Sequence, residues 1–138
     1  MTPQKKSPSQ QMALAAFGAA ILGIIGFFLP MISYSDYGIS VERNGLDLID
    51  TLGDVDICLI IGVISAGYAV VFGLMGMFNR NILCSAAVSA IVAVCPVFYL
   101  FIEKRMLDCA GIGFWLFVIG EGACFALSLV SVNKAKAE

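Results

Sequence analysis

The sequence predicts an all-α membrane protein, a four-helix transmembrane bundle with a short extracellular β-hairpin in its first outer loop. Of its 138 residues, 60% are hydrophobic and 13% are charged, which is far more apolar than an average soluble domain. A soluble chain of this length could not bury so much apolar surface. The apolar residues also gather in four runs, each close to the roughly 20 residues that a transmembrane helix needs.

The four runs define the expected organisation of the chain. A polar tail at residues 1–11 precedes a transmembrane domain at 12–132, and a second tail follows at 133–138. The spans are expected at about residues 12–34, 57–78, 82–102 and 109–132, with the outer loop at 35–56. The first run is too long for the apolar region of a signal peptide, and no A-x-A cleavage pattern follows it. We therefore interpret it as a retained span.

Small residues recur at intervals of four in the first span, at Ala15, Ala19 and Gly23. Such a row lets a neighbouring helix approach closely in a membrane, although the apolar composition alone explains it equally well. Pro30 follows near the expected outer end. Because proline cannot donate a backbone hydrogen bond, we expect regular helix to give way there.

The outer loop carries a strong hairpin signal. Residues 37–41 and 46–48 alternate between apolar and polar side chains, and Asn44-Gly45 separates these two runs. Asn-Gly suits a two-residue hairpin turn because both turn positions need a positive φ. We therefore predict a β-hairpin that turns at Asn44-Gly45. Two strands alone are marginally stable, so the hairpin should rest on the helix ends or on a partner.

The same loop is strongly acidic, with Arg43 as its single basic residue. Its acidic residues are Asp36, Glu42, Asp47, Asp50, Asp54 and Asp56. We interpret them as a solvated surface that could meet a cationic partner. Calcium binding by Asp50, Asp54 and Asp56 is a weaker alternative, because the dense pattern of oxygen ligands of a dedicated calcium loop is missing.

Charge placement predicts the orientation of the chain. Four spans bring both tails to one side. With the tails inside, the basic residues on the inner face are Lys5, Lys6, Arg80, Lys134 and Lys136, and those on the outer face are Arg43, Lys104 and Arg105. The positive-inside rule then favours a multi-pass protein of the cell membrane with both termini cytoplasmic.

One acidic residue lies inside an expected span. Glu121 is near the middle of the last span, between Gly120 and Gly122. An ionised side chain at the bilayer centre costs at least about 2.5–3.5 kcal/mol, and the sequence places no Lys or Arg at a matching depth. We therefore expect Glu121 to face the interior of the bundle and, where no water reaches it, to keep its proton.

Depth and helical spacing select hydrogen-bond partners for Glu121. The candidates are Tyr68, Ser65, Ser89, Cys124 and Ser128, together with the carbonyl of Val92, which Pro96 leaves without a donor. Two interpretations stay open. In one, a neutral Glu121 bonds across the bundle and determines which helices pair; in the other, it titrates or binds a cation along a pathway.

Several functional classes are excluded. The chain has no histidine, so it lacks the commonest general base and metal ligand, and no catalytic triad can be assembled. Its five cysteines form no CxxC pair, and we interpret them as small apolar residues. A disulfide between Cys58 and Cys109, near the outer ends of their spans, is an alternative. We expect no enzymatic activity, cofactor or metal, and the net charge of −2 argues against a nucleic-acid partner.

Two stretches carry a family resemblance. They are FFLPMISYSDYGISVERNGLDLI, a span that runs through a proline into a strand-like loop, and GIGFWLFVIGEGACFALSLV, which precedes the lysine tail. These stretches resemble small bacterial four-span membrane proteins of unassigned function. The layout is also similar to that of the claudin type, but the loop has neither the tryptophans nor the cysteines of the claudin signature.

These observations lead to two functional hypotheses. The first is a non-enzymatic membrane protein in the lipid bilayer, which self-associates or serves as an accessory subunit and presents its acidic outer loop to a partner. The alternative is a small oligomeric ion channel or proton-coupled pore lined by Glu121.

Overall fold

Four long helices and one small sheet make up the computed structural model, which describes residues 8–36, 38–45, 57–103 and 107–137. The long helices are α1 (Pro8–Phe28), α3 (Ile57–Gly76), α4 (Leu83–Glu103) and α5 (Ile112–Ala137). The strands are β1 (Ile32–Asp36) and β2 (Ile39–Arg43), and two 3-10 helices, η1 (Arg80–Ile82) and η2 (Leu107–Cys109), precede α4 and α5. The four long helices are each long and apolar enough to cross a membrane. This confirms the predicted four-helix architecture and is what a multi-pass membrane protein requires.

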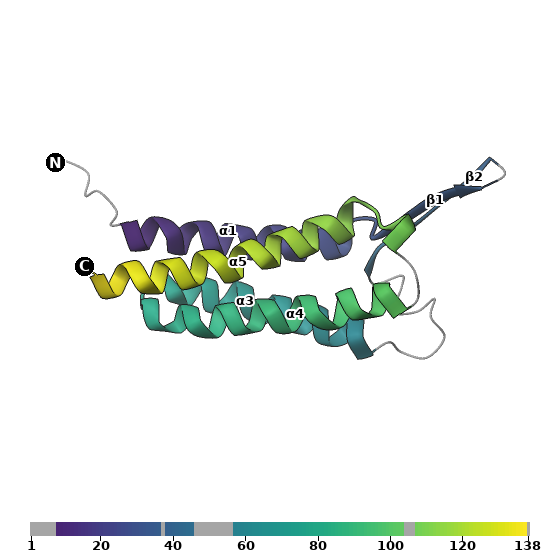
Figure 1. Cartoon of the computed structure of the whole chain (residues 1–138). Helices are drawn as coiled ribbons and strands as arrows, with labels where there is room; N and C mark the ends of the chain where they lie inside the picture. Colours follow the sequence, from purple (N-terminus) through teal and green to yellow (C-terminus); the bar gives the residue numbers. More distant parts are fainter. Residues whose placement is uncertain (1–7, 37, 46–56, 104–106, 138) are drawn as a thin grey trace.

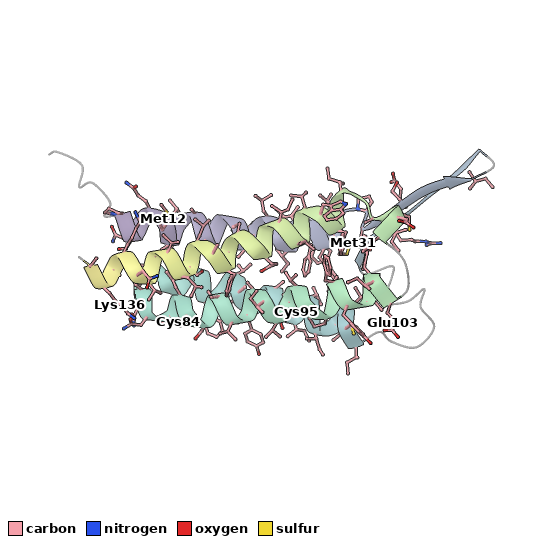
Figure 2. All side chains as sticks on the ribbon, in the orientation of Figure 1. Met12, Met31, Cys84, Cys95, Glu103 and Lys136 are labelled. Atoms are coloured by element: carbon pink, nitrogen blue, oxygen red, sulfur yellow. The ribbon has the colours of Figure 1, made fainter. Side chains whose placement is uncertain are left out.

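The helices form a closed bundle (Figure 1). α1 packs along α5 and α3 packs along α4, while α4 also contacts α5 and α1 contacts α3. α1 begins and α5 ends at one end of the bundle, here called the terminal end, and the strands lie at the opposite end, here called the sheet end. Figure 2 shows Met12 and Lys136 near the terminal end and Met31 and Glu103 near the sheet end.

The first helix is shorter than expected. α1 ends at Phe28, whereas the predicted span continues to about residue 34. The amide of Leu29 still bonds to the carbonyls of Ile25 and Gly26, at 3.1 and 3.2 Å, but Pro30 has no amide to continue the pattern. Proline thus marks the end of regular helix, as expected, and the following residues enter β1.

The two-stranded sheet is present, but the predicted position of its turn is wrong. β1 pairs antiparallel with β2, with Ile32 opposite Arg43 and Asp36 opposite Ile39. The chain therefore reverses between Asp36 and Ile39, where Gly38 has a φ of 78° that glycine adopts without strain. Asn44-Gly45 instead follows β2, and the second run of the predicted hairpin, residues 46–48, lies outside the described residues. The prediction failed because it assigned residues 32–34 to the first span and so overlooked the partner strand.

Backbone hydrogen bonds join the sheet to the bundle. The amide of Met31 donates to the carbonyl of Arg43 at 2.8 Å. On the other side, the amides of Gly111 and Gly113 donate to the carbonyls of Met31 and Pro30 at 2.7 and 2.8 Å. The base of the sheet is therefore held between the end of α1 and the start of α5.

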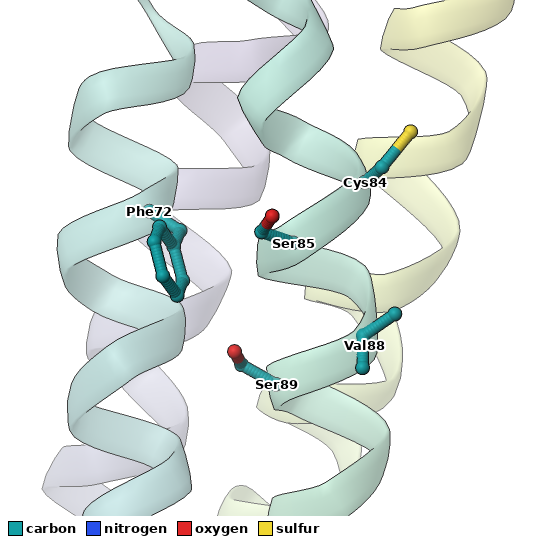
Figure 3. A pocket seen from close by; sticks show the side chains of 5 residues that line it. All are labelled: Phe72, Cys84, Ser85, Val88 and Ser89. Atoms are coloured by element: carbon teal, nitrogen blue, oxygen red, sulfur yellow. The ribbon is translucent and has the colours of Figure 1, made fainter.

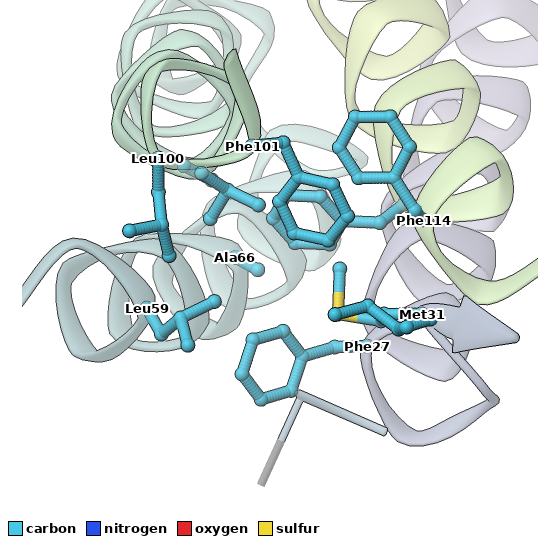
Figure 4. Packing of buried hydrophobic residues seen from close by; sticks show 11 residues of the cluster. Phe27, Met31, Leu59, Ala66, Leu100, Phe101 and Phe114 are labelled. Carbon is cyan, nitrogen blue, oxygen red and sulfur yellow. The ribbon is translucent and has the colours of Figure 1, made fainter. Parts of the chain in front are cut away.

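Large and small side chains occupy different parts of the core. Aromatic residues dominate the part nearest the sheet end, where the rings of Phe101 and Phe114 stack with centroids 4.1 Å apart (Figure 4). Farther along the bundle, one buried cluster consists mainly of alanines: Ala19, Ala20, Ala69, Ala90 and Cys124. Small residues there let the helices approach one another closely, which stabilises helix pairs in a membrane.

The closest approach joins α1 to α5 through glycines. A methyl group on Gly120 would lie 2.5 Å from the amide nitrogen of Gly23 and 2.8 Å from the carbonyl oxygen of Ala19. A methyl group on Gly113 would lie 2.5 Å from the carbonyl oxygen of Gly26. The two backbones therefore touch directly along this contact, here called the glycine seam (Gly23, Gly26, Gly113 and Gly120).

Adding a methyl group to the glycine seam should destabilise the protein. Gly120→Ala is expected to lower the free energy of unfolding by about 1–3 kcal/mol, because rigid backbone opposes the new group. Gly122→Ala is a matched control two residues away, where nothing lies within 4 Å; it should be neutral or stabilising by up to about 1 kcal/mol. Unfolding by sodium dodecyl sulfate in mixed micelles measures both values. Equal changes in the free energy of unfolding for the two variants would show that the backbones do not touch at Gly120.

Candidate functional site

The intramembrane acid lies in the glycine seam. Glu121 is completely buried, with 0% of its surface exposed, which confirms that it faces the interior of the bundle. A methyl group on Gly23 would lie 2.9 Å from both Cγ and Cδ of Glu121, and nearer still to Oε1. The missing side chain of Gly23 therefore provides the space that the carboxyl group occupies between α5 and α1.

The carboxyl group makes no hydrogen bond within the described part of the chain. Both Oε1 and Oε2 of Glu121 are buried and unpaired there. The predicted cross-bundle hydrogen bond is therefore not formed by Tyr68, Ser65, Ser89, Cys124, Ser128 or the carbonyl of Val92. A buried polar group without a hydrogen bond is costly in a membrane. This carboxyl group is therefore the most unusual chemical feature of the bundle.

The predicted partners on α3 and α4 form no hydrogen bond with the carboxyl group. The side chain of Tyr68 is 56% exposed, and its ring stacks on that of Phe72 with centroids 6.1 Å apart. Ser65 is buried on α3, and Ser89 lines a groove between α3 and α4. The prediction relied on depth in the bilayer, which says nothing about the direction in which a side chain points around its helix.

The predicted partners on α5 interact with each other. Cys124 and Ser128 are both buried, and the Sγ and Oγ atoms lie 3.9 Å apart. They follow Glu121 along the same helix, as their spacing predicts, yet neither bonds to the carboxyl group. They are in contact with each other as an i, i+4 pair on α5.

Among the described residues, no cation lies near Glu121. Lys134 and Lys136 stand in the last turn of α5 and Arg80 stands between α3 and α4, toward the terminal end, whereas Arg43 ends β2 at the sheet end. An ionised carboxylate in the seam would therefore have no opposite charge to compensate its loss of water. The arrangement favours the neutral, protonated form of Glu121. This form can donate a hydrogen bond, or lose its proton, only if water or a cation enters the seam.

A polar contact between α1 and α5, which was not predicted, lies near the terminal end. The hydroxyl of Ser131 donates to the backbone carbonyl of Ser9 at 2.6 Å, and this contact is buried. It ties the two helices near the terminal end, as the backbone bonds tie them near the sheet end. No pattern in the sequence indicates a bond between residues so far apart in the chain.

Those remaining predicted site residues that the structure describes are at the sheet end. Cys58 and Cys109 both pack against its aromatic cluster, but no disulfide joins them in this structure. Asp36 and Glu42 belong to β1 and β2. The other four acidic residues of the predicted loop, including the three considered for calcium, lie outside the described residues.

Comparison with known proteins adds no family. The chain matches no protein-family model, and neither a curated protein nor a solved structure was found to be similar to it. The resemblance to small bacterial four-span membrane proteins therefore stays a prediction. Function has to be argued from the geometry of the chain itself.

The contact between Gly23 and Glu121 should appear as an energetic coupling. Gly23→Ala introduces a methyl group against the carboxyl group, whereas in the Glu121→Ala background that group is absent. We therefore expect Gly23→Ala to destabilise the wild-type chain more than the Glu121→Ala chain, by about 0.5–3 kcal/mol, the usual range for residues in contact. Unfolding of all four chains in mixed micelles measures this value. Strict additivity would show that the two residues do not touch.

Proposed function

We propose that this chain is a non-enzymatic protein of the cell membrane, with both termini cytoplasmic, that presents an acidic outer surface to a partner. It serves as an accessory subunit of another protein, or it associates with copies of itself. The single observation that carries the proposal is the sheet, which extends beyond the helices while its base is bonded to the bundle (Figure 1).

The sheet has the properties of a recognition element. A two-stranded sheet is marginally stable by itself, but this one is held at its base by Met31, which bonds to both Arg43 and Gly111. Toward the tip, the side chain of Ile39 is 67% exposed. Strand edges without a neighbour offer unpaired backbone groups to another chain, so the sheet can be extended by a partner.

The charges of the chain are divided between the two ends. Between α1 and α3, and from the last residue of α4 to the start of α5, the sequence has eight acidic and three basic residues. The acidic ones are Asp36, Glu42, Asp47, Asp50, Asp54, Asp56, Glu103 and Asp108. The basic residues of the tails and of the turn before α4 favour a cytoplasmic terminal end. The negative charge at the sheet end favours a partner with a cationic surface.

Site-specific photocrosslinking in cells tests this proposal. A photoreactive amino acid at Ile39 should give a discrete adduct, because a bound partner would cover this position. A band at twice the mass of the chain would indicate self-association, and a band of another mass would indicate a different protein. The same substitution at Ile64, which is 54% exposed on the outside of α3, is the control. No adduct from Ile39, or the same adduct from both positions, would contradict the proposal.

A second function, an oligomeric ion channel or proton-coupled pore lined by Glu121, is favoured by one observation. Both carboxyl oxygens are unpaired within the described residues, as they would be in a site that awaits a proton or cation. Against it, Glu121 faces α1 of its own chain and is fully covered. The carboxyl group could line an oligomer axis only if the glycine seam opened.

Proton flux separates the two functions. Under the main proposal, vesicles containing the Glu121→Gln variant and vesicles containing the wild-type chain should both show only the background leak of empty vesicles. The amide has the size of the neutral acid, so assembly should also be unchanged. A wild-type flux well above background that disappears in Glu121→Gln would instead establish the pore.

A further inference from the structure

A groove opens on the outside of the bundle between α3 and α4, near the terminal end. Its lining residues are Phe72 of α3 and Cys84, Ser85, Val88 and Ser89 of α4, and its volume is about 370 Å³. Figure 3 shows the side chains of Ser85 and Ser89 projecting from α4 toward the α3 side of the groove. In a bundle that crosses a membrane, this part of the surface faces the lipid chains.

The position of the groove relative to the turn between the two helices suggests what fills it. Cys84 and Ser85 belong to the first turn of α4, directly after η1. Phe72 lies one helical turn before Gly76, where α3 ends. The groove therefore starts at the level where the helices leave the membrane and continues toward its interior, which is the direction of a lipid acyl chain.

A cation is held in the turn that joins the two helices of this groove. Arg80 of η1 donates from Nη1 to the carbonyl of Gly76 at 3.0 Å and also to that of Met77. These bonds hold the guanidinium at the end of α3. Nε of Arg80 is buried and has no partner in the described part of the chain, so a phosphate would have to be bound through the Nη groups. Guanidinium groups bind phosphate oxygens well because several donors lie in one plane.

The charge of the whole terminal end matches a negatively charged headgroup. η1 contacts α5, whose last turn carries Lys134 and Lys136. Among the described residues at this end, these lysines and Arg80 are the charged groups, and none is acidic. Basic residues next to a membrane-spanning helix attract anionic lipids and form binding pockets for their headgroups.

We propose that the groove between α3 and α4 binds an anionic phospholipid from the leaflet at the terminal end. One acyl chain lies along Phe72 and Val88, and the phosphate is bound by Arg80. The site does not depend on which side of the membrane the termini occupy. It is also separate from the sheet end, so its failure would leave the proposed function untouched.

The native cysteines allow a test without any substitution. Cys84 lines the groove, whereas Cys95 is exposed farther along α4. We expect dioleoyl phosphatidylglycerol, added to the detergent-solubilised wild-type chain, to slow alkylation of Cys84 by a maleimide and to leave Cys95 unchanged. Peptide mass spectrometry measures the two rates. Dioleoyl phosphatidylcholine tests the need for negative charge, and inorganic phosphate tests a headgroup without a chain.

Two substitutions test the parts of the site. Arg80→Gln should weaken binding of phosphatidylglycerol roughly tenfold, as expected when a hydrogen bond to a charged group is lost, and Arg80→Lys should retain part of it. Ser85→Leu should reduce the binding by filling the groove. Arg43→Gln makes the same change of charge at the sheet end and should bind within about twofold of wild type. Lys134→Gln removes a charge that adds only long-range attraction at the terminal end, so it should weaken binding clearly less than Arg80→Gln does. Native mass spectrometry in detergent measures these affinities.

Four results would overturn the proposal. They are equal protection of Cys84 by phosphatidylcholine, equal protection by inorganic phosphate, unchanged lipid binding by Arg80→Gln, and an equal loss in Lys134→Gln, which would indicate diffuse attraction. Protection of Cys84 that increases with protein concentration without lipid would show that a second copy of the chain occupies the groove.

Discussion

The fold depends on direct backbone contact between the first and last helices. Water cannot drive these helices together inside a membrane, because lipid chains are as apolar as the side chains that they meet. Close packing has to supply the attraction, and Gly23, Gly26, Gly113 and Gly120 permit it by removing side chains from both surfaces. Hydrogen bonds at the two ends of the pair, from Ser131 and from the residues around Pro30, keep the helices in this register.

The same contact positions both of the features on which the two functional proposals rest. It leaves a space at Gly23 that accommodates the carboxyl group of Glu121, and so keeps an acid inside the bundle without a partner among the described residues. It also brings the start of α5 to the end of α1, where Gly111 bonds to Met31 and holds the base of the sheet. A sheet that is bonded at its base to a tightly packed bundle suits a protein that presents a surface, whereas conduction through the seam would require the two helices to separate.

Local patterns predicted the spans well and their ends less well. Pro30 correctly marked the end of regular helix, but the alternating residues after it were assigned to the span because a 23-residue apolar run looks uniform in composition. The hairpin was recognised as a type of structure, yet its turn was placed at Asn44-Gly45. Gly38 provides a competing turn with a positive φ, and the choice between them depends on which strand is available as a partner.

Composition and hydropathy by themselves determined that this chain forms four helices able to cross a membrane, and that Glu121 lies within the last of them. Those features follow from the length of each apolar run and from the cost of exposing it to water. Only the tertiary structure decided that Glu121 faces Gly23 without a hydrogen bond to Ser65 or Tyr68, and that a groove lies between α3 and α4, the two helices that the turn at Arg80 joins. A helix in lipid is apolar on every side, so its sequence does not show which face meets a neighbour, and that face becomes definite only when all four helices are packed.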